Sequence, residues 1–240
     1  MSTTRRPRPR TFEFEKEAGG KRIYYGSSYK KGYDIVLGCA DVMEFLASVP
    51  SNSSSLVVTS PPYNIGKSYE KRMKFEDYLS WQRKVIKECI RTLKATGSIC
   101  WETGNYVEKG EVHPLDVYFT GIFKEFGLIS KKRVIWRIGH GLHARRRFSG
   151  RYETISWYTK GHKHTLNLDR NRVPRKVTPE AWQRVLDDWD EEIWDVPNVK
   201  ANHPEKTIHP CQFPIELVER LILALTNEND VVLDPFAGVG

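Results

Sequence analysis

Short apolar runs alternate with amphipathic segments along this chain, and this alternation restricts its fold more than any other feature of the sequence. Runs rich in β-branched residues predict strands at Tyr33–Leu37, Leu56–Thr59, Ser98–Trp101 and Val231–Leu233. The segment Phe75–Leu93 carries apolar residues at helical spacing and predicts the longest helix. Strands that alternate with helices predict an α/β domain around a mostly parallel sheet.

Other parts of the sequence predict further strands and helices of this domain. Further strands are expected at 23–25, 132–138 and 152–158, and further helices at 42–47, 115–126 and 215–225. In open α/β sheets, ligands bind beyond the carboxyl ends of the strands. Ser60 and Asp234 each follow a predicted strand, so we expect both to face one cleft.

The hexapeptide Thr59–Asn64 has the side chains needed to hold the exocyclic amine of a flat heterocycle. The Ser60 hydroxyl and the Pro61 carbonyl can accept the two N–H bonds of such an amine, and Tyr63 can stack on the ring. Proline fixes φ and has no N–H, so the backbone here is rigid. Ser-Pro-Pro is also common in ordinary turns, and only its surroundings can separate the two interpretations.

A glycine-containing segment, Asp234–Gly240, follows the run Val231–Leu233. Glycines after a buried strand allow a ligand to approach the backbone closely. An ordinary exit from a strand into a turn has a similar sequence, so this segment alone does not define a site.

Positive charge is concentrated in one part of the chain. The formal net charge is +8, but the segment Lys131–Lys176 contains 14 Lys and Arg residues against 2 acids, a local +12 that leaves −4 for the remainder. Such a segment predicts a surface that faces a polyanion, although charge runs are commonly only solvated faces.

The cysteines and histidines do not indicate a metal site. The four cysteines have no C-x-x-C spacing, and the histidines complete no zinc pattern with them. We therefore expect no metal, free thiols and a reducing cytoplasmic location. No apolar run approaches the length of a membrane span, so no membrane partner is expected.

Five segments together resemble the permuted β group of S-adenosylmethionine-dependent DNA amino-methyltransferases, over roughly residues 33–240. Thr59–Tyr63 resembles the catalytic motif IV, and Val231–Gly240 resembles the cofactor motif I. The other three are similar to motifs X, III and VIII of that family: Lys206–Pro214, Leu37–Asp41 and Phe148–Glu153. Each motif is degenerate, but five in the permuted order are specific.

The resemblance implies a Rossmann-like methyltransferase sheet in circularly permuted order. It divides the chain into a basic flexible arm (1–22), a catalytic half (23–138), a motif VIII strand with a basic target-recognition region (139–205) and a cofactor-binding segment (206–240).

The resemblance also assigns roles to individual residues. The catalytic set is Ser60, Pro61, Pro62 and Tyr63. The set expected to bind S-adenosylmethionine is Asp41, Lys206, Thr207, His209, Gln212, Asp234, Pro235, Phe236, Gly238 and Gly240. The set expected to bind double-stranded DNA, through phosphates or guanine edges, is Arg145, Arg146, Arg147, Arg170, Arg172, Arg175 and Lys176.

The implied activity is methyl transfer to the amine of a base flipped out of DNA, as part of a restriction-modification system. Ser60, where adenine-directed motifs more often carry Asp, favours N4 of cytosine, and N6 of adenine is the alternative. An RNA or protein amino-methyltransferase and a DNA-binding remnant without activity are further alternatives.

The resemblance further implies elements that follow the glycine-rich turn, namely a helix and a strand with an acid for the ribose hydroxyls. The sequence stops at Gly240. We therefore expect a cofactor segment that is incomplete by one strand and flanking helices, and weak or no activity of this polypeptide by itself. Either the chain is truncated or a second polypeptide supplies these elements.

Overall fold

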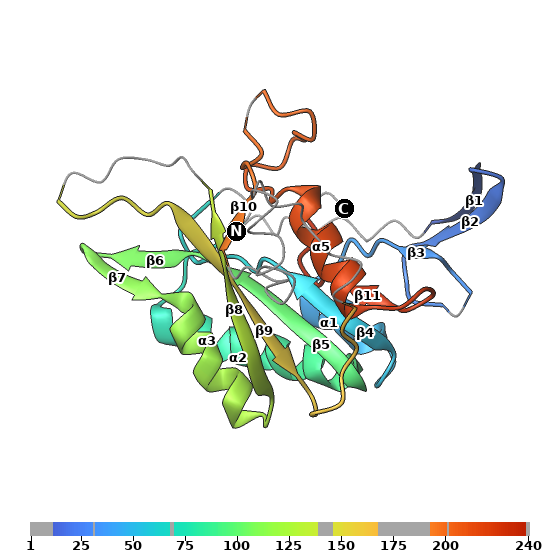
Figure 1. Ribbon diagram of the computed structural model, residues 1–240, viewed down its shortest axis with the longest axis horizontal. Coiled ribbons are helices and arrows are strands. Elements are labelled where there is room, and N and C mark those ends of the chain that lie inside the picture. Colours follow the sequence, from blue (N-terminus) through green and yellow to red (C-terminus); the bar gives the residue numbers. More distant parts are fainter. Residues whose placement is uncertain are drawn as a thin grey trace, which may run out of the picture.

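A computed structural model describes residues 12–30, 32–67, 70–138, 146–167, 193–200 and 202–238. Its centre is a six-stranded sheet in the order β10-β8-β9-β5-β4-β11 (Figure 1). The strands of this sheet are β4 (Ser54–Thr59), β5 (Leu93–Thr103), β8 (Ile129–Arg137), β9 (Tyr152–Thr159), β10 (Ile193–Asp195) and β11 (Val232–Leu233). The helices are α1 (Val42–Ser48), α2 (Phe75–Thr92), α3 (Leu115–Glu125) and α5 (Ile215–Leu225).

The direction of the strands brings several chain segments to one edge of the sheet. Strands β11, β4 and β5 are parallel, β10 is parallel to β8, and β9 runs antiparallel to both β5 and β8. The carboxyl ends of β4, β5, β8, β10 and β11 therefore lie at the same edge as the amino end of β9. The α/β class is confirmed, and the sheet is mostly parallel as predicted, with β9 as its one antiparallel strand among the described residues.

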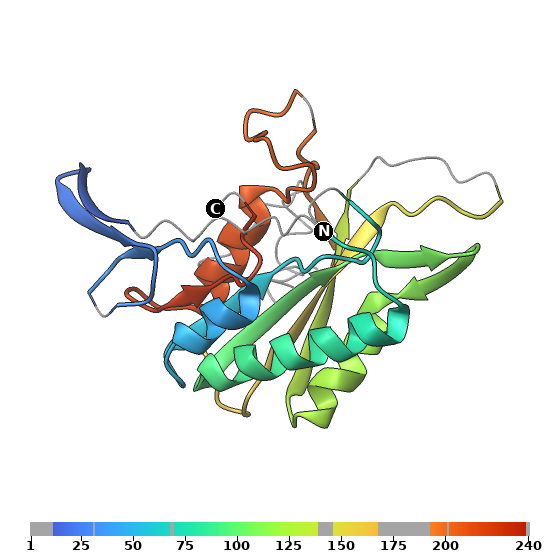
Figure 2. The ribbon, with the colours of Figure 1, turned by 180° about the vertical axis from the view of Figure 1, so that it is seen from behind.

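Helices cover both faces of the sheet. Helices α1, α2 and α3 pack on one face, which is in front in Figure 2, and α5 packs on the other, in front in Figure 1. The alternation of β4 explains this division, because Val57 points to the three-helix side while Leu56 and Val58 point to α5. All six residues of β4 are buried, as expected for a strand covered on both faces.

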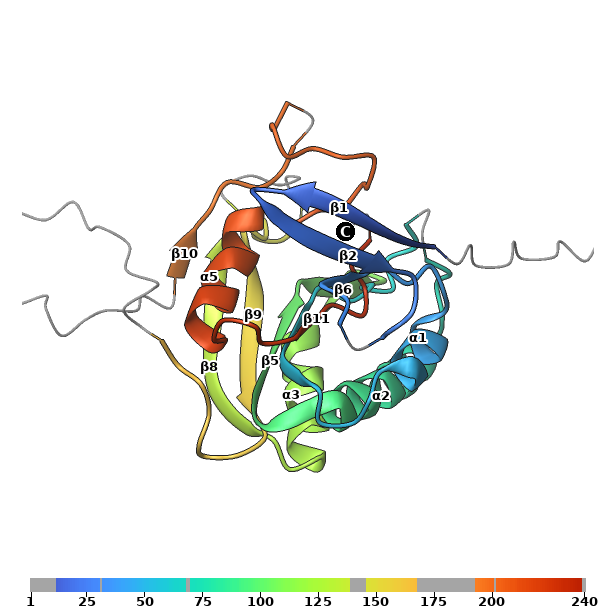
Figure 3. The ribbon, with the colours of Figure 1, turned by 90° about the vertical axis from the view of Figure 1, so that its right-hand side faces the viewer.

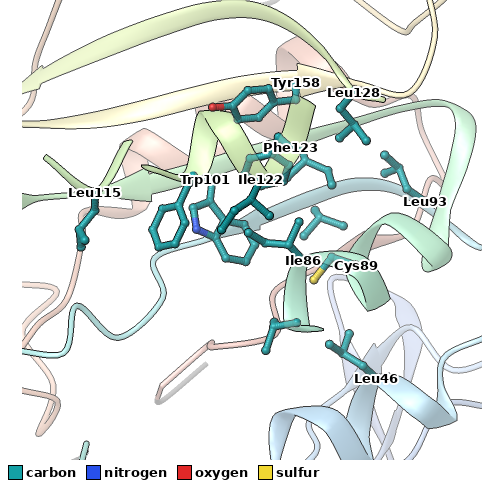
Figure 4. Close-up of a cluster of buried hydrophobic side chains, with 14 of the residues drawn as sticks. Leu46, Ile86, Cys89, Leu93, Trp101, Leu115, Ile122, Phe123, Leu128 and Tyr158 are labelled. Atoms are coloured by element: carbon teal, nitrogen blue, oxygen red, sulfur yellow. The ribbon is translucent and has the colours of Figure 1, made fainter. Parts of the chain in front are cut away.

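Aromatic side chains dominate the core on the three-helix side. Phe123 of α3 stacks on Tyr158 of β9 with ring centroids 4.2 Å apart, and it meets Trp101 of β5 edge-on at 5.7 Å. Figure 4 shows these rings together with Ile86 and Cys89 of α2. This packing fixes β5 between α2 and α3, and it thereby fixes the carboxyl end of β5 at the edge where Ser60 lies.

Most predicted elements are confirmed with small shifts of their ends. The helices expected at 75–93, 115–126 and 215–225 are α2, α3 and α5. The strand expected at 98–101 is longer, because β5 begins at Leu93, directly after α2, and ends at Thr103.

A small separate sheet changes the expected arrangement of the N-terminal region. Strand β1 (Glu13–Ala18) forms a hairpin with β2 (Lys21–Gly26), and β3 (Ile35–Val36) adds to β2 in parallel. The prediction that Tyr33–Leu37 joins the central sheet was wrong, because β3 pairs only with β2 in the described part of the chain. Residues 13–22, which were expected in a flexible arm, lie in this hairpin, and residues 1–11 lie outside the described ranges. This small sheet projects to one side of the main sheet, on the right in Figure 1, so the hairpin lies toward the viewer in Figure 3.

The sequence analysis also missed a second hairpin, β6 (Asn105–Glu108) with β7 (Glu111–Pro114), which connects β5 to α3. Among the described helices, none is both long and apolar enough to cross a membrane.

Candidate active site

The peptide that follows β4 is held in place from several sides. Tyr78 of α2 donates a hydrogen bond from Oη to the Pro62 carbonyl at 2.8 Å. The buried Asn64 adopts a positive φ of 61° and bonds both the N–H and the carbonyl of Met73 through its side chain. Within the described part of the chain, the carbonyl of the buried Pro61 accepts no hydrogen bond.

The hydroxyl groups of this peptide form a chain that leads into the protein. Ser60 Oγ lies 3.1 Å from Tyr63 Oη, and Tyr63 Oη donates to Glu102 Oε2 at 2.6 Å. Burial and the nearby glutamates raise the pKa of Tyr63 well above its usual value, so the phenol keeps its proton. Tyr63 is half-buried and tied by its hydroxyl to β5, which fixes the direction of its ring.

Glu102 lies near the carboxyl end of β5 and Glu153 near the amino end of β9. Burial and the neighbouring Glu153 raise the pKa of Glu102 well above its ordinary range. Gly104 makes room for this arrangement, because a Cβ at that position would lie 3.1 Å from the Tyr63 ring and 3.2 Å from Glu153 Oε1. Two carboxyl groups therefore lie directly behind the Ser60 and Tyr63 hydroxyls.

Asp234 connects the end of β11 to the end of β4. Thr59 Oγ1 donates to Asp234 Oδ1 at 2.5 Å, and the Phe236 N–H donates to the same oxygen at 2.9 Å. Burial raises the Asp234 pKa to about 6, although both hydrogen bonds act in the opposite direction. The Phe236 ring packs edge-on against Trp81 of α2, which anchors the turn after β11.

This buried carboxyl predicts a pH-dependent stability. A pKa raised from 3.8 to about 6 means that the folded state favours the protonated form. Its contribution is therefore fully present below pH 4 and is lost as the pH rises through 6, by about 3 kcal/mol in total. We expect Asp234→Asn to gain stability relative to wild type by about this amount between pH 4 and 8, measured by urea unfolding. The exposed Asp77→Asn is the matched control, and parallel pH profiles of wild type and Asp234→Asn would contradict the assignment.

The loop before α5 is closed by its own hydrogen bonds. Thr207 donates from its N–H and its hydroxyl to Gln212 Oε1, at 3.1 and 2.9 Å, and Gln212 Nε2 donates to the Glu205 carbonyl at 2.8 Å. Lys206 Nζ donates to the His209 carbonyl. These contacts give the loop a fixed shape.

The same loop meets the turn after β11. Gly238 has a φ of 67°, and a Cβ there would lie 3.3 Å from the His209 ring. Two segments that were expected to form one cofactor site thus lie close together at Gly238 and His209. Pro235, in the same turn as Gly238, is half-buried.

The other predicted site residues are less closely connected. Asp41 caps the amino end of α1, where its carboxylate accepts the Met43 N–H at 2.9 Å. Arg146 and Arg147 are exposed near the amino end of β9. The predictions for six others lie outside the described residues: Gly240, Arg145, Arg170, Arg172, Arg175 and Lys176. In the described ranges, no three His, Cys, Asp or Glu side chains are grouped as a metal site would require.

Sequence reasoning missed Glu102 because the expected strand ended at Trp101, and it noted Glu153 only as part of a motif. A charged residue at the end of a continuous apolar strand is the signal that could have identified Glu102, since ionisable residues are rarely fully buried.

Comparisons with known proteins agree with this geometry. A family model described as DNA methylase, of the N6 and N4 type, matches residues 54–240. The Type II methyltransferase M.BglII of Bacillus subtilis is 42% identical over 89% of this chain and 62% of its own length. The DNA adenine methyltransferase YhdJ of Escherichia coli is 32% identical over 82% of this chain and 69% of its own.

One solved structure resembles this chain in both fold and sequence. The Thermus thermophilus protein TTHA0409, crystallised with S-adenosyl-L-methionine, is 28% identical, with a TM-score of 0.56 over 84% of this chain and 80% of that one. The present chain spans less than two thirds of M.BglII. With the family model matched over more than half of its residues, the chain belongs to the N6/N4 DNA methylase family.

Proposed function

We propose that this protein transfers a methyl group from S-adenosylmethionine to the exocyclic amine of a base extruded from double-stranded DNA. The observation that carries the proposal is the 2.5 Å hydrogen bond between Thr59 and Asp234. This bond joins the peptide Thr59–Asn64, here called the amine-holding peptide, to the turn after β11 that is expected to bind the cofactor. Both lie at the same edge of the six-stranded sheet. Methyl transfer needs these two groups side by side, because the amine must approach the methyl carbon in line with the breaking bond.

The residues after β4 suit the amine. Ser60 and the Pro61 carbonyl accept its N–H bonds and turn the nitrogen lone pair toward the methyl donor, and Tyr63 offers its ring to the base. The base must leave the helix, since its amine is otherwise paired and its faces are covered. S-adenosylmethionine, when bound, supplies an activated methyl group on sulfur, so the protein acts mainly by positioning.

The residues around β11 fit this cofactor. Asp234 places a buried carboxylate at the end of β11, where it suits the cationic amino group of the cofactor. Gly238 has no side chain, so the His209 ring lies close to the backbone of this turn. The TTHA0409 complex supports the same cofactor by similarity. Lys206, Thr207, His209, Gln212, Phe236 and Asp41 remain the proposed neighbours of the cofactor.

Gly238→Ala is expected to weaken S-adenosylmethionine binding by about tenfold or more, measured by calorimetry. Its side chain would be strained at a positive φ and would press on His209. Gly110→Ala is the matched control, because Gly110 also has a positive φ, of 91°, but open space around it. Equal affinities of Gly238→Ala and wild type would remove this turn from the cofactor site.

The proposed target atom is N4 of cytosine, because Ser60 replaces the Asp common in adenine-directed motifs. N6 of adenine is the second candidate, favoured by the similarity to YhdJ. Mass spectrometry of nucleosides from DNA treated with the protein separates the two products. Methylated RNA or protein with unmodified DNA would overturn the proposal.

Two further proposals concern partners. The basic segment at 139–176, with Arg146 and Arg147 exposed, is proposed to hold the DNA of a restriction-modification target.

A second polypeptide is proposed to add a strand beside β11, whose one strand neighbour in the described part is β4. Mixing this chain with a chain that carries the expected helix and acidic strand should raise labelled-methyl transfer, and equal rates with and without it would contradict the second proposal.

A further inference from the structure

Two carboxyl groups behind the amine-holding peptide, the buried Glu102 and the half-buried Glu153, have no assigned role in positioning the amine or the cofactor. Glu102 is 5% exposed, and Glu153 lies against it from the neighbouring strand β9. Glutamate is almost never buried unless its charge is compensated. In the described part of the chain, Glu102 has no ion pair with Lys or Arg, and the side chains that act on its carboxyl group are those of Glu153, Ser60 and Tyr63. The pair therefore needs another form of compensation.

A proton shared by the two glutamates supplies this compensation. The two side chains are close enough to hydrogen-bond each other, which requires a proton on one of them because an ionised carboxylate only accepts. Among the described residues, Glu102 Oε1 is also one of three buried side-chain nitrogen and oxygen atoms that have no hydrogen-bond partner. Burial and the like charge of Glu153 both raise the pKa of Glu102, which favours a proton on this side of the pair.

We propose that Glu102 and Glu153 hold one proton between them and take up the proton released when the target amine is methylated. The inference rests on the proposed function for the transfer step, but the shared proton does not depend on it. Glu102 receives the proton through the hydroxyl chain of Tyr63 and Ser60, and Glu153 sets the proton affinity of Glu102.

The step balances in atoms and charge. The amine nitrogen forms a bond to the methyl carbon as the methyl–sulfur bond breaks, and the positive charge moves from sulfur to nitrogen. One N–H proton then passes to Ser60 Oγ, the Ser60 proton passes to Tyr63 Oη, and the Tyr63 proton passes to Glu102 Oε2, over donor–acceptor distances of 3.1 and 2.6 Å within the protein. Both hydroxyls are restored, and the negative charge of the pair is neutralised.

Infrared spectroscopy tests the shared proton without any activity. At pH 8 we expect wild type to show a carbonyl band of a protonated carboxylic acid, which Glu102→Gln and Glu153→Gln each remove. Asp234 does not interfere, because its pKa of about 6 leaves it ionised at pH 8. Glu228→Gln, at an exposed turn, is the matched control and should keep the band. The absence of the band from wild type, or its survival in both variants, would overturn the proposal.

Single-turnover kinetics test the uptake of the released proton. Glu102→Gln should reduce the rate of methyl transfer by about 10²–10⁴-fold with the KM for DNA unchanged. Glu153→Gln should move the acid limb of the pH–rate profile about one unit or more to lower pH, because it removes the like charge and offers a donor to Glu102. A purely structural role would alter the melting temperature and leave the profile in place, and that result would overturn the relay.

The two proposals fail in different ways. A wild-type chain that shows the infrared band but methylates no DNA, even when mixed with a chain that carries the expected helix and acidic strand, would overturn the proposed function together with the relay, and would leave the shared proton established. A wild-type chain that methylates DNA, with Glu102→Gln equally fast, would overturn the relay alone.

Discussion

Replacing Ser60 with Ala is expected to reduce the single-turnover rate of methyl transfer to DNA by about 10²–10³-fold. The Ser60 hydroxyl is the proposed side-chain acceptor for the target amine, and its loss leaves one N–H of that amine without a partner. The affinity for S-adenosylmethionine should stay within about twofold of wild type, because the proposed cofactor contacts come from other segments. Rapid-quench assays with labelled cofactor measure the rate, and calorimetry measures the affinity.

The control for this change is Ser48→Ala. Ser48 is exposed at the end of α1 and donates only to the Phe45 carbonyl. Its replacement removes the same hydroxyl at a distance from the amine-holding peptide, and the rate should not change. A Ser60→Ala variant as fast as Ser48→Ala would show that the hydroxyl does not hold the amine.

Phe123→Ala is expected to destabilise the fold by about 3–5 kcal/mol, measured by urea unfolding. Phe123 is fully buried between α3 and the sheet, and its ring contacts both Tyr158 and Trp101 (Figure 4). Removal of the ring leaves a cavity that these rigid neighbours cannot fill. A change this large is a substantial part of the stability of an ordinary domain.

Val117→Ala, on the exposed side of the same helix, is the matched control. Val117 is 62% exposed, so its truncation removes little buried surface, and we expect a change within about 0.5 kcal/mol. Similar losses for both variants would indicate that α3 responds to helix propensity rather than to packing.

The helices of this protein were predictable because their patterns are local. The helix α5 begins and ends at the predicted residues, Ile215 and Leu225, and α2 differs from its prediction by one residue. Apolar residues at helical spacing create a stripe that any suitable core will bury. The pairing of strands is not local, and the two-residue strand β3 joins the N-terminal hairpin although its sequence equally suits the central sheet.

The peptide that we propose to hold the amine could be identified in the sequence for a similar reason. Ser60, Pro61 and Tyr63 are close together in sequence, and proline fixes their backbone whatever surrounds them. The partners of this peptide were not predictable. Glu102 and Glu153 are separated by 51 positions, and no local pattern indicates that β5 and β9 bring them together.

The sequence by itself determined the α/β class, the main helices and the chemical groups proposed to hold the amine, because these depend on residues near one another in the chain. Only the tertiary structure decided that Thr59 bonds Asp234, that His209 lies on Gly238 and that two carboxyl groups share the space behind Tyr63. Such contacts depend on strand order and register. Both are decided by how all the apolar faces are buried at once, which no single segment of the sequence contains.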